Sequence, residues 1–467
     1  MGELQYVCLM PHPPIIIPEV GGEESEVCRA TIDAMEEAAN KIVDSSAETV
    51  VVITAHGNVF QDAVSIIAAD TVKGDMGQFN ASEVKFDYPY NLKLAEALQQ
   101  QCRKRGINVA FIDKLLAKDY GLKLTLDHGV MVPLYYLQKA GFQGSLVVVA
   151  MGLLPFLELY SFGVALQEAV VQHQGKAALL ASGDMSHRLT QDAPAGFNPR
   201  GQEFDDKLQQ YLVEGAVEDI VHIPEALVEE AGECGLRPIV MALGALDGYQ
   251  ISPRILSYQG PFGVGYLVAE LFAGGEKGDS IYPHLEEIKK QNVTQSRAKE
   301  HQLVRLARET LEAAVHHGQF TEPDHELPED LPQQAGVFVS LKKGGQLRGC
   351  IGTIEPTQDN LVQEVMRNAL SAGLSDPRFD PVEERELKDI TYSVDVLHPA
   401  EDIDSAEQLD PQKYGVIVRS GARSGLLLPN LEGINTVAEQ VNIALGKGGI
   451  NPRDDYSLQR FKVDRYY

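Results

Sequence analysis

Four histidines in the first half of the chain have the setting expected of metal ligands or acid–base catalysts. His12, His56 and His187 each follow a short apolar run typical of a strand, and prolines on both sides of His12 place it on a stiff, non-helical segment. His128 follows Asp127, whose carboxylate could orient an imidazole ring. One such histidine is more often a structural residue, but neutral imidazoles are the commonest metal ligands. Four in similar positions favour a metal site.

Two neighbouring residues, Glu233 and Cys234, offer a third ligand. With two histidines, Glu233 would complete the two-histidine, one-carboxylate face that holds ferrous iron and leaves positions open for substrate and dioxygen. Cys234 is the competing donor and favours a softer metal, zinc or copper. The same acidic segment also fits a solvated helix end, so spacing leaves the third ligand open.

Strands and helices alternate around these residues. The runs 49–54, 145–150 and 177–182 are continuous apolar segments, as in strands buried on both faces. Residues 90–105 carry leucines and alanines on one stripe, which predicts a helix. We therefore predict an α/β domain with a mainly parallel sheet. Ligand sites in such sheets gather beyond the carboxyl ends of the strands, where the histidines are expected to meet.

The second half of the chain has a different pattern. Apolar residues recur at helical spacing over 303–314. Alternation over 337–341 ends in a Lys-Lys-Gly-Gly turn, and two apolar runs within 414–428 are joined by Ser-Gly, so both segments predict hairpins. This half is expected to be a smaller α+β domain.

A glycine- and charge-rich break at 273–280 marks the division between the two halves. We predict an N-terminal domain over 1–275, a linker over 276–294 and a C-terminal domain over 295–467.

Composition excludes several classes of protein. The 467 residues include 67 acidic and 40 basic side chains, a formal net charge of −27, which argues against binding nucleic acid or anionic membranes. Five cysteines form no CxxC pair and suggest free thiols in a reducing compartment. The most apolar stretch, 145–166, contains proline and glutamate and makes a poor membrane span. With no signal peptide at its start, the chain is expected to be cytoplasmic.

Four motifs resemble the class III extradiol dioxygenase (LigB-like) superfamily, which includes the Memo-like proteins. They are PHPPIIIPEVG at 11–21, AHG at 55–57, DHG at 127–129 and GDMSH at 183–187, and the resemblance spans residues 1–272. It implies an α/β fold and non-haem Fe(II) held by His12, His56 and a late carboxylate, here Glu233. It also implies His187 as the acid–base residue and His128 as a donor near dioxygen or substrate.

This sequence departs from the ring-cleaving pattern at the third ligand. Ring-cleaving members use glutamate, whereas the Memo-like branch has a cysteine near the equivalent position. Because Glu233 and Cys234 are adjacent, the resemblance leaves Cys234 as the alternative ligand and zinc or copper as alternative metals.

The second half resembles the AMMECR family over residues 295–467. The motifs are LRGCIG at 347–352, DPRF at 376–379 and GLLLP at 425–429. Within the first motif, Arg348 and Cys350 could form an anion or thiol site, or serve as a surface ion-pair donor and a buried small residue. The fusion matches the AmmeMemoRadiSam arrangement and implies a radical SAM protein as partner. This chain lacks the CxxxCxxC pattern of a radical SAM cluster.

Two hypotheses about function follow. The first is an iron-dependent extradiol-type dioxygenase, or a related oxidoreductase, acting on a small catechol-like or phenolic substrate. The second is a Memo-like metal-binding protein without ring-cleaving activity that partners a radical SAM enzyme. A zinc hydrolase is weaker, because no HExxH or nucleophile-elbow motif is present. A homo-oligomer is compatible with either hypothesis.

Overall fold

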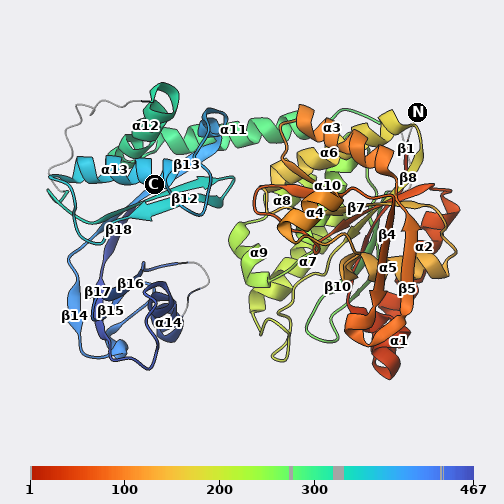
Figure 1. Cartoon of the computed structure of the whole chain (residues 1–467), viewed down its shortest axis with the longest axis horizontal. Helices are drawn as coiled ribbons and strands as arrows, with labels where there is room; N and C mark the ends of the chain where they lie inside the picture. The colour runs from red at the N-terminus through yellow and green to blue at the C-terminus, as the bar shows by residue number, and fades with distance from the viewer. Residues whose placement is uncertain (1–2, 273–276, 319–330, 432–433, 435) are drawn as a thin grey trace. The chain divides into compact units, whose positions relative to one another are not determined.

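Continuous apolar runs form the centre of an eight-stranded sheet in the first part of the chain. The computed structural model describes residues 3–272, 277–318, 331–431, 434 and 436–467 (Figure 1). In spatial order the strands are β6 (Val109–Ile112), β3 (Val64–Ile67), β7 (Ser145–Ala150), β2 (Thr49–Thr54), β8 (Lys176–Ser182), β1 (Glu3–Met10), β10 (Tyr266–Phe272) and β9 (Arg254–Gln259). Every residue of β2 is buried, as expected of a strand covered on both faces.

The strand directions confirm the predicted α/β class. The central strands β7, β2, β8 and β1 run parallel. At one side, β10 and β9 are antiparallel because a short turn joins them, and β3 pairs antiparallel with β7 at the other. The sheet is therefore parallel at its centre and mixed towards its edges.

Helices cover both faces of this sheet (Figure 1). One layer contains α3 (Leu92–Lys104), α6 (Phe156–His173) and α10 (Leu236–Ala245), which pack on one another, and the other contains α2 (Arg29–Asp44) and α5 (His128–Lys139). The remaining helices are α1 (Pro18–Gly21), α4 (Lys114–Tyr120), α7 (Pro199–Glu214), α8 (Val217–Val221) and α9 (Glu225–Ala231). The helix predicted over 90–105 is α3, and it begins at Leu92 because the Asn91 side chain accepts the Leu94 N–H.

A separate two-stranded hairpin stands beside the main sheet. It consists of β4 (Thr71–Met76) and β5 (Ala81–Pro89), which pair antiparallel. The sequence did not predict it, because half of its side chains are polar and it has no long apolar run.

The second part of the chain contains two four-stranded sheets, in agreement with the predicted α+β class. The first is β12 (Gln346–Gly352), β11 (Val337–Lys343), β13 (Ile390–Leu397) and β18 (Val463–Tyr466), and it packs against α12 (Gln302–His317) and α13 (Leu361–Leu374). The second is β14 (Glu401–Ile403), β17 (Ser457–Phe461), β15 (Gly415–Ser420) and β16 (Arg423–Leu427), and it packs against α14 (Val437–Lys447). Both predicted hairpins are present, as β11–β12 and β15–β16.

Two compact units result, one reaching to Glu286 and the other beginning at Glu287. The predicted linker, 276–294, includes much of helix α11 (Tyr282–Ala298), and the predicted break at 273–280 lies partly outside the described residues. The domain limits given above therefore stay a prediction. Among the described helices, none is both long and apolar enough to cross a bilayer.

Candidate metal centre

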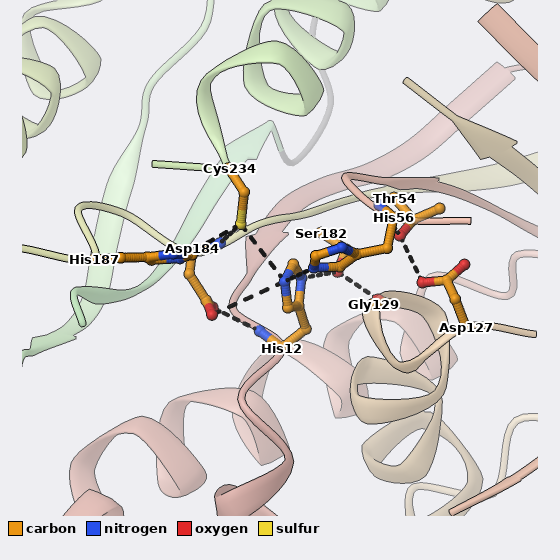
Figure 2. Close-up of polar contacts among 9 residues, drawn as sticks. All are labelled: His12, Thr54, His56, Asp127, Gly129, Ser182, Asp184, His187 and Cys234. Atoms are coloured by element: carbon orange, nitrogen blue, oxygen red, sulfur yellow. Dashed lines mark hydrogen bonds and ion pairs between the residues drawn. The ribbon is translucent and has the colours of Figure 1, made fainter. Parts of the chain in front are cut away.

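Three of the predicted histidines follow neighbouring strands and lie at one edge of the sheet. Strands β2, β8 and β1 are adjacent and parallel, and they are followed by His56, His187 and His12 respectively. His128 differs from the expectation, because it is the first residue of helix α5 and does not follow a strand. Figure 2 shows His12, His56 and His187 with their polar neighbours at this edge.

His12, His56 and His128 form a compact cluster. The Nε2 atoms of His12 and His56 are 2.9 Å apart. The His128 ring centroid lies 4.2 Å from that of His56 and 5.3 Å from that of His12. One nitrogen from each of the three rings lies within 4.8 Å of the others, which is close enough for a shared metal ion.

A hydrogen-bond chain fixes the tautomer of His12. The Ser182 hydroxyl donates to the carbonyl of Gly129, so its oxygen can only accept from Nδ1 of His12, 3.0 Å away. The ring proton of His12 must therefore be on Nδ1. This leaves the Nε2 lone pair facing the cluster, which is the form in which imidazole binds a metal.

Cys234 reaches the same cluster from the loop between α9 and α10. Its Sγ lies 3.6 Å from Nε2 of His12 and 3.8 Å from Nε2 of His187 (Figure 2). Asp184 completes a second group with His12 and Cys234, and one Asp184 carboxylate oxygen accepts the His12 backbone N–H at 2.9 Å. The cluster therefore has nitrogen, sulfur and oxygen donors within one small volume.

Two glycines allow the Cys234 loop to approach the end of β8. A Cβ on Gly183 would lie 2.3 Å from Cα of Gly235, so no larger residue fits without moving the backbone. In this contact the Cys234 N–H donates to the Asp184 carbonyl, and the Asp184 N–H donates to Cys234 Sγ, both at 3.2 Å. The position of Cys234 is thus set by backbone packing.

Glu233 lies next to Cys234 but its carboxylate is engaged elsewhere. Oε2 of Glu233 accepts the Leu236 N–H at 2.6 Å, at the start of α10. Among the described residues, Glu233 is in neither group of metal-binding geometry. Its assignment as an iron ligand stays a prediction, and the geometry favours the alternative ligand, Cys234.

Burial disfavours the charged forms of the side chains in this cluster. It lowers the pKa of His12 well below its usual value, with further lowering by the neighbouring histidines, and it lowers the pKa of His128 to about 4. Burial also lowers the pKa values of His56 and His187. The same cause raises the pKa of Cys234, and that of Asp184 to about 7. Neutral imidazoles beside a thiol are ready to receive a cation, so the donor set fits a transition metal.

A cavity of about 530 Å³ adjoins the cluster, with His56 and His128 in its wall. The ends of β2, β3 and β7, the β4–β5 hairpin and residues 121–128 also contribute to the lining. Asn58 and Lys123 close one side, since the Asn58 amide donates to the Lys123 carbonyl at 2.7 Å and accepts its N–H at 3.1 Å. The volume suits a small organic molecule beside the histidines.

Sequence reasoning missed two residues of this site. Ser182 and Asp184 were not singled out, although Asp184 lies inside the quoted motif at 183–187. Their positions in the sequence could have indicated them. Ser182 is the last residue of β8, and Asp184 lies two residues beyond it, in the segment that carries His187. Buried polar residues at a strand end are the pattern to look for.

Comparison with known families identifies both parts of the chain. Residues 6–269 match the family described as the catalytic LigB subunit of aromatic ring-opening dioxygenase. The chain belongs to the LigB family. Residues 304–467 match the AMMECR1 family, so a LigB domain and an AMMECR1 domain are fused in one chain. LigB proteins are metal-dependent, and the cluster provides a His/Asp/Cys site for such an ion.

One relative matches nearly the whole chain, and others match one part of it. Protein CA_C1420 of Clostridium acetobutylicum is 41% identical over 460 residues, covering 98% of each chain. A Thermotoga maritima protein is 49% identical over 170 residues, 36% of this LigB–AMMECR1 chain and 98% of its own length. The crystal structure of uncharacterized protein JW3007 from Escherichia coli K12 is 17% identical with a TM-score of 0.41, covering 57% of this chain and 100% of that one.

In the AMMECR1 domain, the two residues singled out from the sequence have separate partners. Arg348 forms a two-pronged ion pair with Glu386, with N···O distances of 3.0 and 2.9 Å. Cys350 is partly buried, accepts the Ser340 hydroxyl at 3.2 Å through Sγ, and donates its N–H to Asp376 at 2.9 Å. Both residues therefore take part in the domain's own hydrogen bonds, and whether they also form an anion or thiol site stays a prediction.

Proposed function

We propose that the LigB domain is a metal-dependent oxidoreductase of the extradiol dioxygenase type, acting on a small catechol-like or phenolic substrate. The observation that carries this proposal is that His12 belongs to two groups of metal-binding geometry, one with His56 and His128 and one with Asp184 and Cys234, beside a cavity that has His56 and His128 in its wall. A LigB domain with metal donors and an adjoining cavity of about 530 Å³ has the parts that such chemistry needs.

His12, His56 and Cys234 are our proposed ligands for the ion, with Asp184 beside them. Ferrous iron is the metal we propose, and zinc and copper are the alternatives because thiolate is a soft donor. A bound ion of this type would supply Lewis-acid and redox chemistry towards phenolic oxygens and dioxygen.

The remaining histidines would handle protons and orient the substrate. His187 is neutral when the site is empty, because burial lowers its pKa, so it can accept a proton from a substrate hydroxyl and return it later. His128 lies in the cavity wall and can donate a hydrogen bond to a substrate oxygen. Leu126 and Met131 are apolar residues in a largely polar lining, and they could contact the ring of the substrate.

A second candidate is a Memo-like metal-binding protein that does not cleave rings and that partners a radical SAM enzyme. The position of Cys234 in the cluster favours it, since Glu233 is turned to the Leu236 N–H. The fused AMMECR1 domain is consistent with this alternative.

The two candidates differ in what the loaded protein does. We would purify the chain anaerobically, load it with Fe(II), add catechol and follow catecholate absorption and dioxygen uptake. The dioxygenase proposal expects both signals, and an iron-loaded protein that shows neither would refute it. The second candidate expects metal binding without dioxygen uptake, together with capture of a radical SAM protein.

Substitutions test the ligand assignment separately from the activity. Cys234→Ala should abolish stoichiometric metal binding, whereas Glu233→Ala should keep it. Cys350→Ala is the matched control, because Cys350 is also a partly buried free thiol but lies in the AMMECR1 domain. If only Glu233→Ala loses the metal, the ligand is Glu233, as in the ring-cleaving pattern, and the assignment of Cys234 is wrong.

A further inference from the structure

A buried carboxylate that is not among the proposed ligands lies beneath the segment carrying His187. Asp205, on helix α7, is fully buried. Its Oδ1 accepts the Ser186 N–H at 2.8 Å, and its Oδ2 accepts the Tyr258 hydroxyl at 2.6 Å. Both oxygens are therefore used, and one of them holds the backbone one residue before His187.

Ser186 extends this contact to both sides of His187. The Ser186 hydroxyl donates to the Ala231 carbonyl at 2.8 Å and accepts the Arg188 N–H at 3.1 Å. The His187 N–H donates to the same Ala231 carbonyl at 3.3 Å. The backbone before, at and after His187 is thus fixed by hydrogen bonds to Asp205, to the Ala231 carbonyl and to the Ser186 hydroxyl.

The same network reaches Cys234. Ala231 ends helix α9, three residues before Cys234, and the backbone contacts with Asp184 described above join the Cys234 loop to the His187 segment. The 3.8 Å separation between Cys234 Sγ and His187 Nε2 therefore depends on how these two segments are held.

An ionised carboxylate is the group that this position requires. Two donors, one N–H and one O–H, point at Asp205, and a carboxylate can accept both. An amide of the same shape has one accepting oxygen and one NH₂, which would face a donor and lose a contact. Space is also limiting, because a Cβ on Gly265 would lie 2.3 Å from Oδ2 of Asp205.

We propose that Asp205 is a positioning residue of the site. Through Ser186 it holds Nε2 of His187 at 3.8 Å from Sγ of Cys234. The kinetic part of this proposal rests on the proposed oxidoreductase function, whereas the structural part can be measured without metal or substrate.

The test compares Asp205→Asn with a matched control, Asp247→Asn. Asp247 is also buried in the LigB domain, and its Oδ1 alone accepts both the Tyr160 hydroxyl at 2.9 Å and the Ile281 N–H at 3.0 Å. It lies beyond the far end of α10, which begins two residues after Cys234. Because one amide oxygen can keep both of its contacts, Asp247→Asn controls for the loss of a buried charge, and its melting temperature should fall less than that of Asp205→Asn.

The primary readout is histidine-selective NMR of the full chain without metal, with the His187 signals assigned by His187→Gln. Asp205→Asn should shift or broaden the His187 signals, and Asp247→Asn should leave them unchanged. Unchanged His187 signals in folded Asp205→Asn, or equal changes in both variants, would overturn the proposal. If Asp205→Asn does not fold, Tyr258→Phe removes one of the two donors, and an absence of any His187 shift in that variant would overturn it.

The kinetic readout is dioxygen uptake with catechol by the iron-loaded protein. A displaced proton-transfer group should lower kcat about 100-fold in Asp205→Asn with little change in KM. A fall no larger than that of Asp247→Asn would refute the positioning role. If the wild-type protein consumes no dioxygen but the NMR difference is observed, the proposed function fails and the positioning of His187 stands.

Discussion

Ser182→Ala should weaken metal binding although Ser182 is not a proposed ligand. The serine side chain is fully buried, and its oxygen accepts Nδ1–H of His12 at 3.0 Å while its proton goes to the Gly129 carbonyl. Alanine removes both contacts and leaves the space of the hydroxyl empty. His12 then has no partner that keeps its proton on Nδ1, and the competing tautomer carries the proton on the nitrogen that faces the metal.

The expected loss of metal affinity can be worked out from the hydrogen bond between His12 and Ser182 that the substitution removes. Removing a hydrogen-bond partner of a ligating histidine typically costs about 10- to 100-fold in metal affinity, or about 1.4 to 2.8 kcal/mol. Leaving a buried donor unpaired costs a further 1 to 3 kcal/mol or so of folding stability. The dissociation constant for the metal should therefore rise by at least about tenfold, and the melting temperature should fall.

The assay is a competition titration against a chromophoric chelator under anaerobic conditions. Ser161→Ala is the matched control, since Ser161 is also buried in the LigB domain, hydrogen-bonds the Tyr282 hydroxyl and lies in α6, outside the histidine cluster. An affinity of Ser182→Ala equal to that of the wild type would show that the tautomer is set in another way. Equal weakening in both variants would show that the effect is one of general stability.

Three other outcomes are expected. Gly183→Ala should lower the melting temperature and weaken metal binding by about tenfold or more, because its Cβ would meet Cα of Gly235 at 2.3 Å; thermal melts with metal titration check this. Hydrogen bonds from Arg378 lower the pKa of Asp376 to about 2, so the pair stabilises the fold by about 2 kcal/mol above pH 4 and loses this contribution as pH falls towards 2. Urea unfolding of Arg378→Gln should accordingly differ from wild type at pH 5 and converge with it near pH 2, whereas a constant difference would contradict the assignment. Metal at 100 times its dissociation constant should stabilise the folded chain by about 2.7 kcal/mol, and a chelator should reverse this without changing the far-ultraviolet circular dichroism.

Much of the fold could be predicted because the apolar runs are long and local. Residues 49–54 and 145–150 are strands with the predicted limits, and a buried parallel strand leaves little freedom in its sequence. His12, His56 and His187 follow adjacent strands, so their meeting could be predicted from topology alone.

The third ligand could not be settled in the same way. Glu233 and Cys234 are neighbours in a short loop, and which side chain faces the histidines depends on the contact between Gly183 and Gly235, which are 52 residues apart in sequence. The role of Ser182 was hidden for a similar reason, since its partners come from the segment after β1 and from α5. Hydrophobic periodicity reports burial, whereas these features depend on long-range backbone packing.

The contact between Gly183 and Gly235 also bears on how a metal would enter and leave. Because glycine backbones bring the sulfur and the imidazoles together, backbone packing contributes to the donor separation. Sites that fold around their metal lose structure when the ion departs. We therefore expect an ion to exchange within an intact protein, so that the metal found after purification would reflect the supply during growth and handling as well as the ligands.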